Sequence, residues 1–144
     1  MRILALDLGA KRIGLAISDA ESQLAFPAGV HERGGNQHDL TALAELARER
    51  GVERIVVGLP LHMNGRSGPE AEAARRFAES LHLLTGLPVD LLDERWTTRE
   101  AERTLRELGR RPSQHRGDVD ATAAALLLHT YLERRVREER RKAR

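Results

Sequence analysis

The chain contains no cysteine in its 144 residues. This excludes disulfide bonds, a thiolate nucleophile and any cysteine-based zinc or iron–sulfur site. No apolar run approaches the roughly 18 to 20 residues that cross a membrane. The N-terminus leads directly into a predicted strand and lacks the pattern of a signal peptide. We therefore expect a cytoplasmic protein with no membrane partner.

Lysine is also scarce, with 2 lysines against 22 arginines. Arginine suits bidentate contacts to phosphate, although a codon bias would produce the same ratio. Residues 133–144 contain seven basic and three acidic side chains, a net charge of +4, so residues 1–132 sum to −2. We expect one domain over residues 1–132, and a basic extension of the last helix or a tail over 133–144. Such an extension is compatible with nucleic-acid binding or with simple solvation.

The first part of the chain predicts strands at residues 2–8, 12–18 and 23–30, joined by short turns. Strands connected in this way form an antiparallel meander. Residues 34–36 then predict a loop, and an amphipathic helix follows over residues 38–50.

The second part alternates strands and helices, which is typical of parallel pairing. Strands are expected at 54–58 and 89–92, and a helix runs from Pro69 to about Thr85. A capping box at Thr97 predicts a further helix, and the last helix starts near Gly117. The fold class is therefore α/β, with a mixed sheet flanked by helices.

Three acidic residues interrupt stretches that should be apolar: Asp7, Glu94 and Asp120. Asp7 shares a strand face with Ile3 and Ala5, because strand side chains alternate. Glu94 follows a strand end, where α/β folds place ligands. Asp120 lies on the packed face of the last helix. A buried carboxylate is costly unless it is paired, protonated or bound to a metal.

Two neighbouring acids compete for these roles. Asp93 points the opposite way from Glu94 if the strand continues, and the sequence does not separate the two. Asp118 is the better helix N-cap, because acids are favoured at helix N-termini. We therefore interpret Asp118 as structural and Asp120 as the site residue.

Three carboxylates, with no cysteine and no clustered histidine, favour hard divalent cations, Mg²⁺ or Mn²⁺. Two such ions can activate a water molecule and stabilise the leaving oxygen in phosphodiester cleavage. Candidate phosphate contacts are Lys11, Arg12, Arg66 and Arg116. The turn at Gly9 is also typical of ATP-binding domains of the actin and sugar-kinase type, so the motif alone is only moderately specific.

Four motifs, occurring in one order, carry a resemblance over nearly the whole chain. They are residues 7–14 (DLGAKRIG), 58–61 (GLPL) with Gly65, Gly68 and Pro69, 93–98 (DERWTT), and Val119-Asp120 before an alanine-rich helix. Together they resemble the YqgF-like pre-16S rRNA nucleases, also described as Holliday-junction-resolvase-like.

The resemblance implies a ribonuclease H-like fold with a five-stranded sheet, and metal-dependent nuclease chemistry by acids corresponding to Asp7, Glu94 and Asp120. It favours Glu94 over Asp93 and Asp120 over Asp118. The implied role is 5′-end maturation of 16S rRNA. The chain departs from the family pattern at His62, Asn64, Arg116 and Asp118, which bears on substrate contacts.

Two rival functions remain open at this stage. A Holliday-junction resolvase would use the same chemistry on four-way DNA, and it would require a homodimer that presents two sites. A nucleic-acid-binding module without catalysis would bind in a salt-sensitive way and show no metal-dependent turnover.

Overall fold

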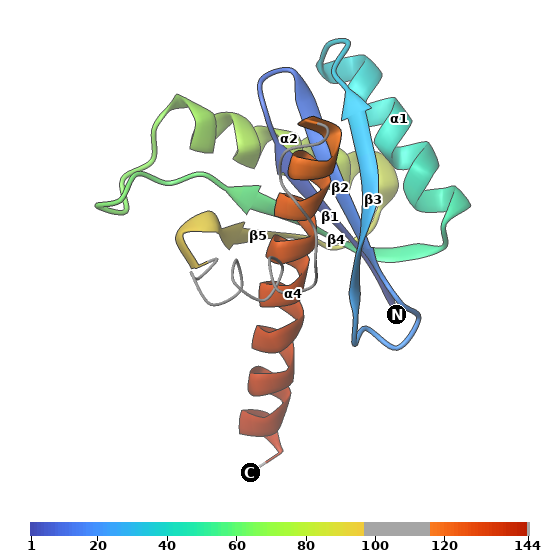
Figure 1. Cartoon of the computed structure of the whole chain (residues 1–144), viewed down its shortest axis with the longest axis vertical. Helices are drawn as coiled ribbons and strands as arrows, with labels where there is room; N and C mark the ends of the chain where they lie inside the picture. The colour runs from blue at the N-terminus through green and yellow to red at the C-terminus, as the bar shows by residue number, and fades with distance from the viewer. Residues whose placement is uncertain (97–115, 144) are drawn as a thin grey trace.

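A single mixed sheet with helices on both faces forms the body of the computed structural model, which describes residues 1–96 and 116–143 (Figure 1). The elements in chain order are β1 (Arg2–Leu8), β2 (Arg12–Ser18), β3 (Ala25–Glu32), α1 (Asn36–Glu49), β4 (Val52–Leu59), α2 (Pro69–Thr85), β5 (Val89–Asp93), the 3₁₀ turn η1 (Glu94–Trp96) and α4 (Arg116–Lys142). The strand order is β3-β2-β1-β4-β5. The first three strands pair antiparallel, whereas β4 pairs parallel with both β1 and β5. The predicted meander and the α/β class are confirmed.

The strand expected at 23–30 is displaced along the chain and starts at Ala25. The reason is the Asp19 side chain, whose Oδ1 accepts the backbone N–H groups of Gln23 at 2.7 Å and Leu24 at 3.0 Å. These bonds hold the residues before Ala25 in a turn. The expected strand at 54–58 lengthens to β4, because it pairs along both of its edges.

The helix expected at 38–50 begins two residues earlier, at Asn36, so the predicted loop at 34–36 is wrong at its last residue. Gly35 supplies the N-cap in a conformation with φ 108°, which favours glycine. The helix predicted from Thr97 lies outside the described residues.

The strand side chains alternate between two cores on opposite faces of the sheet. Leu4 and Leu6 of β1 pack under α1 and α2, whereas Ile3 and Ala5 pack under α4. The sheet-facing side of α4 carries the fully or nearly fully buried residues Ala124, Ala125, Leu127 and Leu128. Small alanine side chains allow this helix to lie close to the sheet.

The C-terminal half of α4 leaves the sheet and projects away from the body (Figure 1). Residues 136–143 are all exposed. Over residues 1–96 and 116–143, no helix combines the length and the apolar character that crossing a bilayer requires.

A buried carboxylate anchors the start of α1. Asp39 is fully buried, and it accepts hydrogen bonds from the Gly34 backbone N–H at 3.0 Å, the Arg33 Nε at 3.1 Å and the His31 Nε2 at 2.8 Å. Burial alone raises the pKa of the Asp39 carboxyl, but these three donors outweigh burial and hold the pKa below its usual value. Arg33 also donates to the Gly9 carbonyl oxygen at 3.0 Å, so the network reaches the β1–β2 turn.

Replacing this carboxylate, in Asp39→Asn, is predicted to lower the free energy of unfolding at pH 7 by about 2 kcal/mol, because charged donors lose their acceptor. The folded-state pKa of Asp39 lies below its ordinary 3.8. Its contribution is therefore complete above that value and is lost as pH falls through the folded pKa. Urea unfolding should show a gap between wild type and variant at pH 7 that closes in acid. A gap independent of pH would contradict the ionised state.

Candidate active site

The second-last position of β1 holds Asp7, on the α4 side of the sheet. Its neighbours on that face, Ile3 and Ala5, are fully buried, as the strand alternation predicted. On one side Asp7 pairs with Gly14 of β2. On the other side the parallel register ends at Leu6↔Val57, so the following residue of β4, Gly58, lies beside Asp7. A glycine thus occupies each strand that flanks this carboxylate.

These two glycines provide the space that the site requires. A Cβ at Gly58 would lie 2.4 Å from Oε1 of Glu94, and a Cβ at Gly14 would lie 2.1 Å from the carbonyl oxygen of Asp120. Real Cβ contacts are not that short. Glycine at both positions therefore allows Glu94 and the start of α4 to close over the end of β1.

Glu94 follows β5 directly and begins η1. Burial raises the pKa of its carboxyl to about 8, and a hydrogen bond shared with Asp7, the charge of Asp7 and the charge of Asp93 act in the same direction. The carboxyl groups of Asp7 and Glu94 are therefore neighbours in a partly desolvated environment. Two carboxylates so placed repel each other when both are ionised, and a bound cation would remove that repulsion.

Asp120 lies near the start of α4, and an arginine of β2 binds its carboxylate. The Arg12 Nε donates to the Asp120 Oδ2 at 3.2 Å. The Nη1 of Arg12 also lies 3.7 Å from Oε1 of Glu32. The residues that share its helix face, such as Ala124 and Leu127, are buried, as the helical spacing predicted. Because Gly14 touches the Asp120 backbone and pairs with Asp7, the two acids lie on adjacent segments.

The structure distinguishes the competing acid Asp93 from Glu94 by its partner. Arg95 donates hydrogen bonds to the Asp93 carboxylate, with Nε 3.0 Å from both oxygens and Nη2 2.6 Å from Oδ2. Arg95 also donates to the Met63 carbonyl oxygen at 3.2 Å, which ties the β4–α2 loop to the end of β5. The side chain of the other competitor, Asp118, lies outside the described residues.

The predicted phosphate contacts are dispersed. Lys11 is exposed on the β1–β2 turn, and Arg12 is engaged with Asp120. Arg66 is exposed in the β4–α2 loop, where its backbone N–H donates to the Asn64 side chain at 3.0 Å. The side chain of Arg116 lies outside the described residues. No described contact joins Lys11 or Arg66 to the carboxylates.

Sequence reasoning missed the spatial roles of Gly14, Gly58 and Arg95. The signal available in the sequence was that both glycines interrupt predicted strands, which is typical of a close approach by another segment. Nothing local to Arg95 indicates that it neutralises Asp93 and leaves Glu94 to face Asp7.

The three acids lie at the ends of β1 and β5 and the start of α4. Asp7 and Glu94 are neighbours there, whereas Asp120 approaches through its backbone at Gly14 and its carboxylate is bound by Arg12. Oxygen ligands fit a hard divalent cation. The two glycines leave room beside Asp7 for the Glu94 side chain and for the Asp120 backbone. The chemistry of these donors fits a divalent cation, while among the described residues the three carboxylates do not form a closed ligand set.

Comparison of the sequence with known proteins gives consistent matches. The model of the family described as "RuvX: Holliday junction resolvase" matches residues 1–134. A protein of Anaeromyxobacter dehalogenans (strain 2CP-C) is 48% identical over 135 residues, 94% of this chain and 98% of that protein. One from Chloroflexus aurantiacus (strain ATCC 29366 / DSM 635 / J-10-fl) is 44% identical over 133 residues, covering 92% and 87%. Both are named "Putative pre-16S rRNA nuclease".

Solved structures give the fold. RuvC of T. thermophilus in complex with Holliday junction substrate superposes with a TM-score of 0.63 at 16% identity, covering 92% of this chain and 95% of that chain. The fowlpox virus Holliday junction resolvase gives 0.57 at 14% identity, covering 92% and 99%. The predicted ribonuclease H-like fold is thus confirmed, and so is membership of a nuclease family. The chain belongs to the RuvX family.

Proposed function

We propose that this protein is a metal-dependent endonuclease that hydrolyses phosphodiester bonds in the 5′-end maturation of pre-16S rRNA, in the cytoplasm. The observation that carries the proposal is that Glu94 lies beside Asp7, while the backbone of Asp120 lies against Gly14, the strand partner of Asp7. The names of relatives that align over 92–94% of this chain support the rRNA substrate.

The three carboxylates would hold the cations, Mg²⁺ or Mn²⁺ and two in number. Ions bound there would supply Lewis-acid polarisation of the scissile phosphate and activation of the attacking water. Arg12 orients Asp120 through its 3.2 Å contact. Lys11, Arg66 and Arg116 are proposed to contact substrate phosphates, together with Arg12 where substrate draws it from Asp120.

A Holliday-junction resolvase is the second candidate. It is favoured by the description of the family and by the fold shared with RuvC, whose structure contains a Holliday junction substrate. Symmetric cleavage of a junction needs two sites related by a two-fold axis, and therefore a homodimer. A module that binds nucleic acid without cutting it is the third candidate.

We further propose that residues 1–132 form the nuclease domain and that 133–144 contact nucleic acid beyond the cleavage site. Residues 136–143 are exposed on the projecting end of α4, and residues 133–144 carry a net charge of +4. Lys142 lies 22 residues after Asp120, roughly 33 Å at 1.5 Å per helical residue. That distance is about one turn of a duplex.

Cleavage is predicted to require Glu94. Glu94→Gln should reduce metal-dependent cleavage at least about 10²-fold, because the amide is a poor cation ligand, whereas Glu45→Gln on the exposed side of α1 should leave it unchanged. Asp7→Asn should act as Glu94→Gln does. The substrates are a 16S rRNA precursor fragment and a synthetic four-way DNA junction, each with Mn²⁺ or Mg²⁺.

Each outcome of that assay selects one function. Cutting of the RNA alone supports rRNA processing, and paired symmetric nicks in the junction support the resolvase. Tight binding without cutting of either substrate supports the non-catalytic module. Full activity of Glu94→Gln would contradict the proposed metal site.

Stability of the cation-free protein is predicted to fall as pH rises from about 4.5 to about 8. Glu94 titrates at about 8 in the folded state against an ordinary 4.5, so between these values the native state binds more protons than the unfolded state. Asp7→Asn removes one charge that raises the pKa of Glu94, so the stability of this variant should decline less steeply with pH. Burial still raises the Glu94 pKa, so part of the decline should remain. Thermal unfolding in EDTA across this pH range measures both. Identical slopes would show that the two carboxylates do not interact.

The basic end of α4 is predicted to matter only for long substrates. The triple variant Arg140→Gln, Arg141→Gln, Lys142→Gln should reduce the slope of log affinity against log salt by up to about 3 for duplexes longer than one turn. Short duplexes should bind as they do to wild type. Glu138→Gln with Glu139→Gln, on the same exposed segment, is the matched control and should not weaken binding. Equal losses on short and long duplexes would argue against a remote contact.

A further inference from the structure

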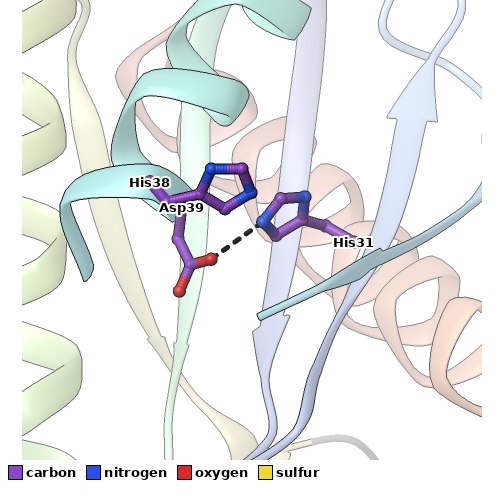
Figure 2. A group of neighbouring side chains, drawn as sticks. All are labelled: His31, His38 and Asp39. Atoms are coloured by element: carbon purple, nitrogen blue, oxygen red, sulfur yellow. Dashed lines mark hydrogen bonds and ion pairs between the residues drawn. The ribbon is translucent and has the colours of Figure 1, made fainter. Parts of the chain in front are cut away.

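Two histidines and an aspartate gather where β3 passes into α1, away from the three carboxylates of the candidate active site. His31 comes from β3, and His38 and Asp39 come from the first turns of α1 (Figure 2). One ligand atom from each of the three residues can be chosen so that all lie within 4.8 Å of one another. The expectation that no histidines cluster is therefore wrong for this pair.

The acidic member of the cluster is a fixed anion. Asp39 is fully buried, and its Oδ2 is bound by the Arg33 Nε at 3.1 Å. Its Oδ1 faces the His31 Nε2 at 2.8 Å and accepts the Gly34 N–H at 3.0 Å. One oxygen is thus held by the guanidinium, while the other points towards the imidazoles (Figure 2).

The second imidazole, that of His38, lies beside the first. The rings of His31 and His38 stack with centroids 5.5 Å apart. A Cβ at Gly34 would lie 2.7 Å from the Cδ2 of His38, so the ring rests against the glycine backbone. Within the described part of the chain, no hydrogen bond or ion pair explains why His38 is held there.

We propose that His31, His38 and Asp39 form a binding site for one divalent transition-metal ion of the zinc class. Two imidazoles and one carboxylate are a set that such ions prefer, and Mg²⁺ does not. Bonds of 2.0–2.2 Å around a tetrahedral ion place the ligand atoms about 3.3 Å apart. The 2.8 Å between His31 Nε2 and Asp39 Oδ1 must therefore open slightly, and the His38 ring must turn inward. The ion takes the place of the proton between them, so the neutral His31 ring then carries its proton on Nδ1.

The surroundings already provide the second layer of a metal site. Arg33 and the Gly34 N–H would remain on the Asp39 carboxylate, as partners that orient a ligating carboxylate commonly do. The positive charge of Arg33 lowers the attraction for a cation, so the affinity should be moderate. A water molecule would complete the coordination on the exposed side of His38.

This site is separate from the carboxylates of Asp7, Glu94 and Asp120. His31 pairs with Ile13 and so lies on the α1–α2 face of the sheet, whereas Asp7 lies on the α4 face. A metal here would cross-link β3 to α1. Through Arg33, which binds the Gly9 carbonyl oxygen at 3.0 Å, it would also stiffen the turn that follows Asp7.

The test is zinc binding by titration calorimetry on the full chain carrying Asp7→Asn, which weakens binding at the active-site carboxylates. We expect one Zn²⁺ per chain, and His38→Ala should weaken that binding at least about tenfold. His38 is exposed, so the variant should fold. The matched control is His129→Ala, which removes an exposed helical histidine that pairs with Glu133 at 3.0 Å, and it should bind Zn²⁺ as its parent does.

Two further readouts use the same proteins. Zinc should raise the melting temperature of the parent and of His129→Ala but not that of His38→Ala. Co²⁺ in place of zinc should give the visible absorption of a tetrahedral ion with nitrogen ligands, lost in His38→Ala. Zinc binding that is absent from the parent, or unchanged in His38→Ala, would overturn the proposal.

Discussion

The arrangement of this end of the sheet depends on how closely two segments approach the strands beside Asp7. Both approaches pass over glycine: Glu94 lies against Gly58, and the backbone of Asp120 lies against Gly14. A side chain at either position would separate the acids by the width of a methyl group or more. The close approach buries Glu94 beside another carboxylate. Burial first, and then the hydrogen bond and charge of Asp7, raise the pKa of Glu94. A site that is costly without a cation and relaxed with one is well suited to bind it.

An arginine on each face of the sheet holds the β1–β2 turn in place. On the α4 face, Arg12 holds Asp120 against the sheet. On the other face, Arg33 links the Gly9 carbonyl oxygen to the buried Asp39. The turn that follows Asp7 is therefore fixed from both sides, by one arginine on each. Preorganisation of this kind places ligands before substrate binds, so little reorganisation is left for the reaction itself.

Sequence periodicity predicted which side chains share a face of a single strand or helix. The strand alternation placed Asp7 with Ile3 and Ala5, and the helical spacing placed Asp120 with Ala124, and both placements are confirmed. The choice between Asp93 and Glu94 was different, because it depends on Arg95, whose guanidinium reaches both Asp93 and the Met63 carbonyl oxygen. The residue pattern around positions 93–95 is compatible with either acid facing β1, so local reasoning alone left the choice open.

The histidine cluster was hidden from the sequence for a similar reason. His31 and His38 are separated by a change of direction at Gly34 and Gly35, and no regular period relates a strand residue to a helix residue across such a turn. What brings His31 to the start of α1 is the buried Asp39, which needs donors to stay ionised in the core and which directly follows His38 in the sequence. Satisfying that one carboxylate draws β3, the turn and α1 into contact. The demand of a buried charge for partners thus shapes both faces of this sheet, through arginine and histidine on one face and, we propose, through divalent cations on the other.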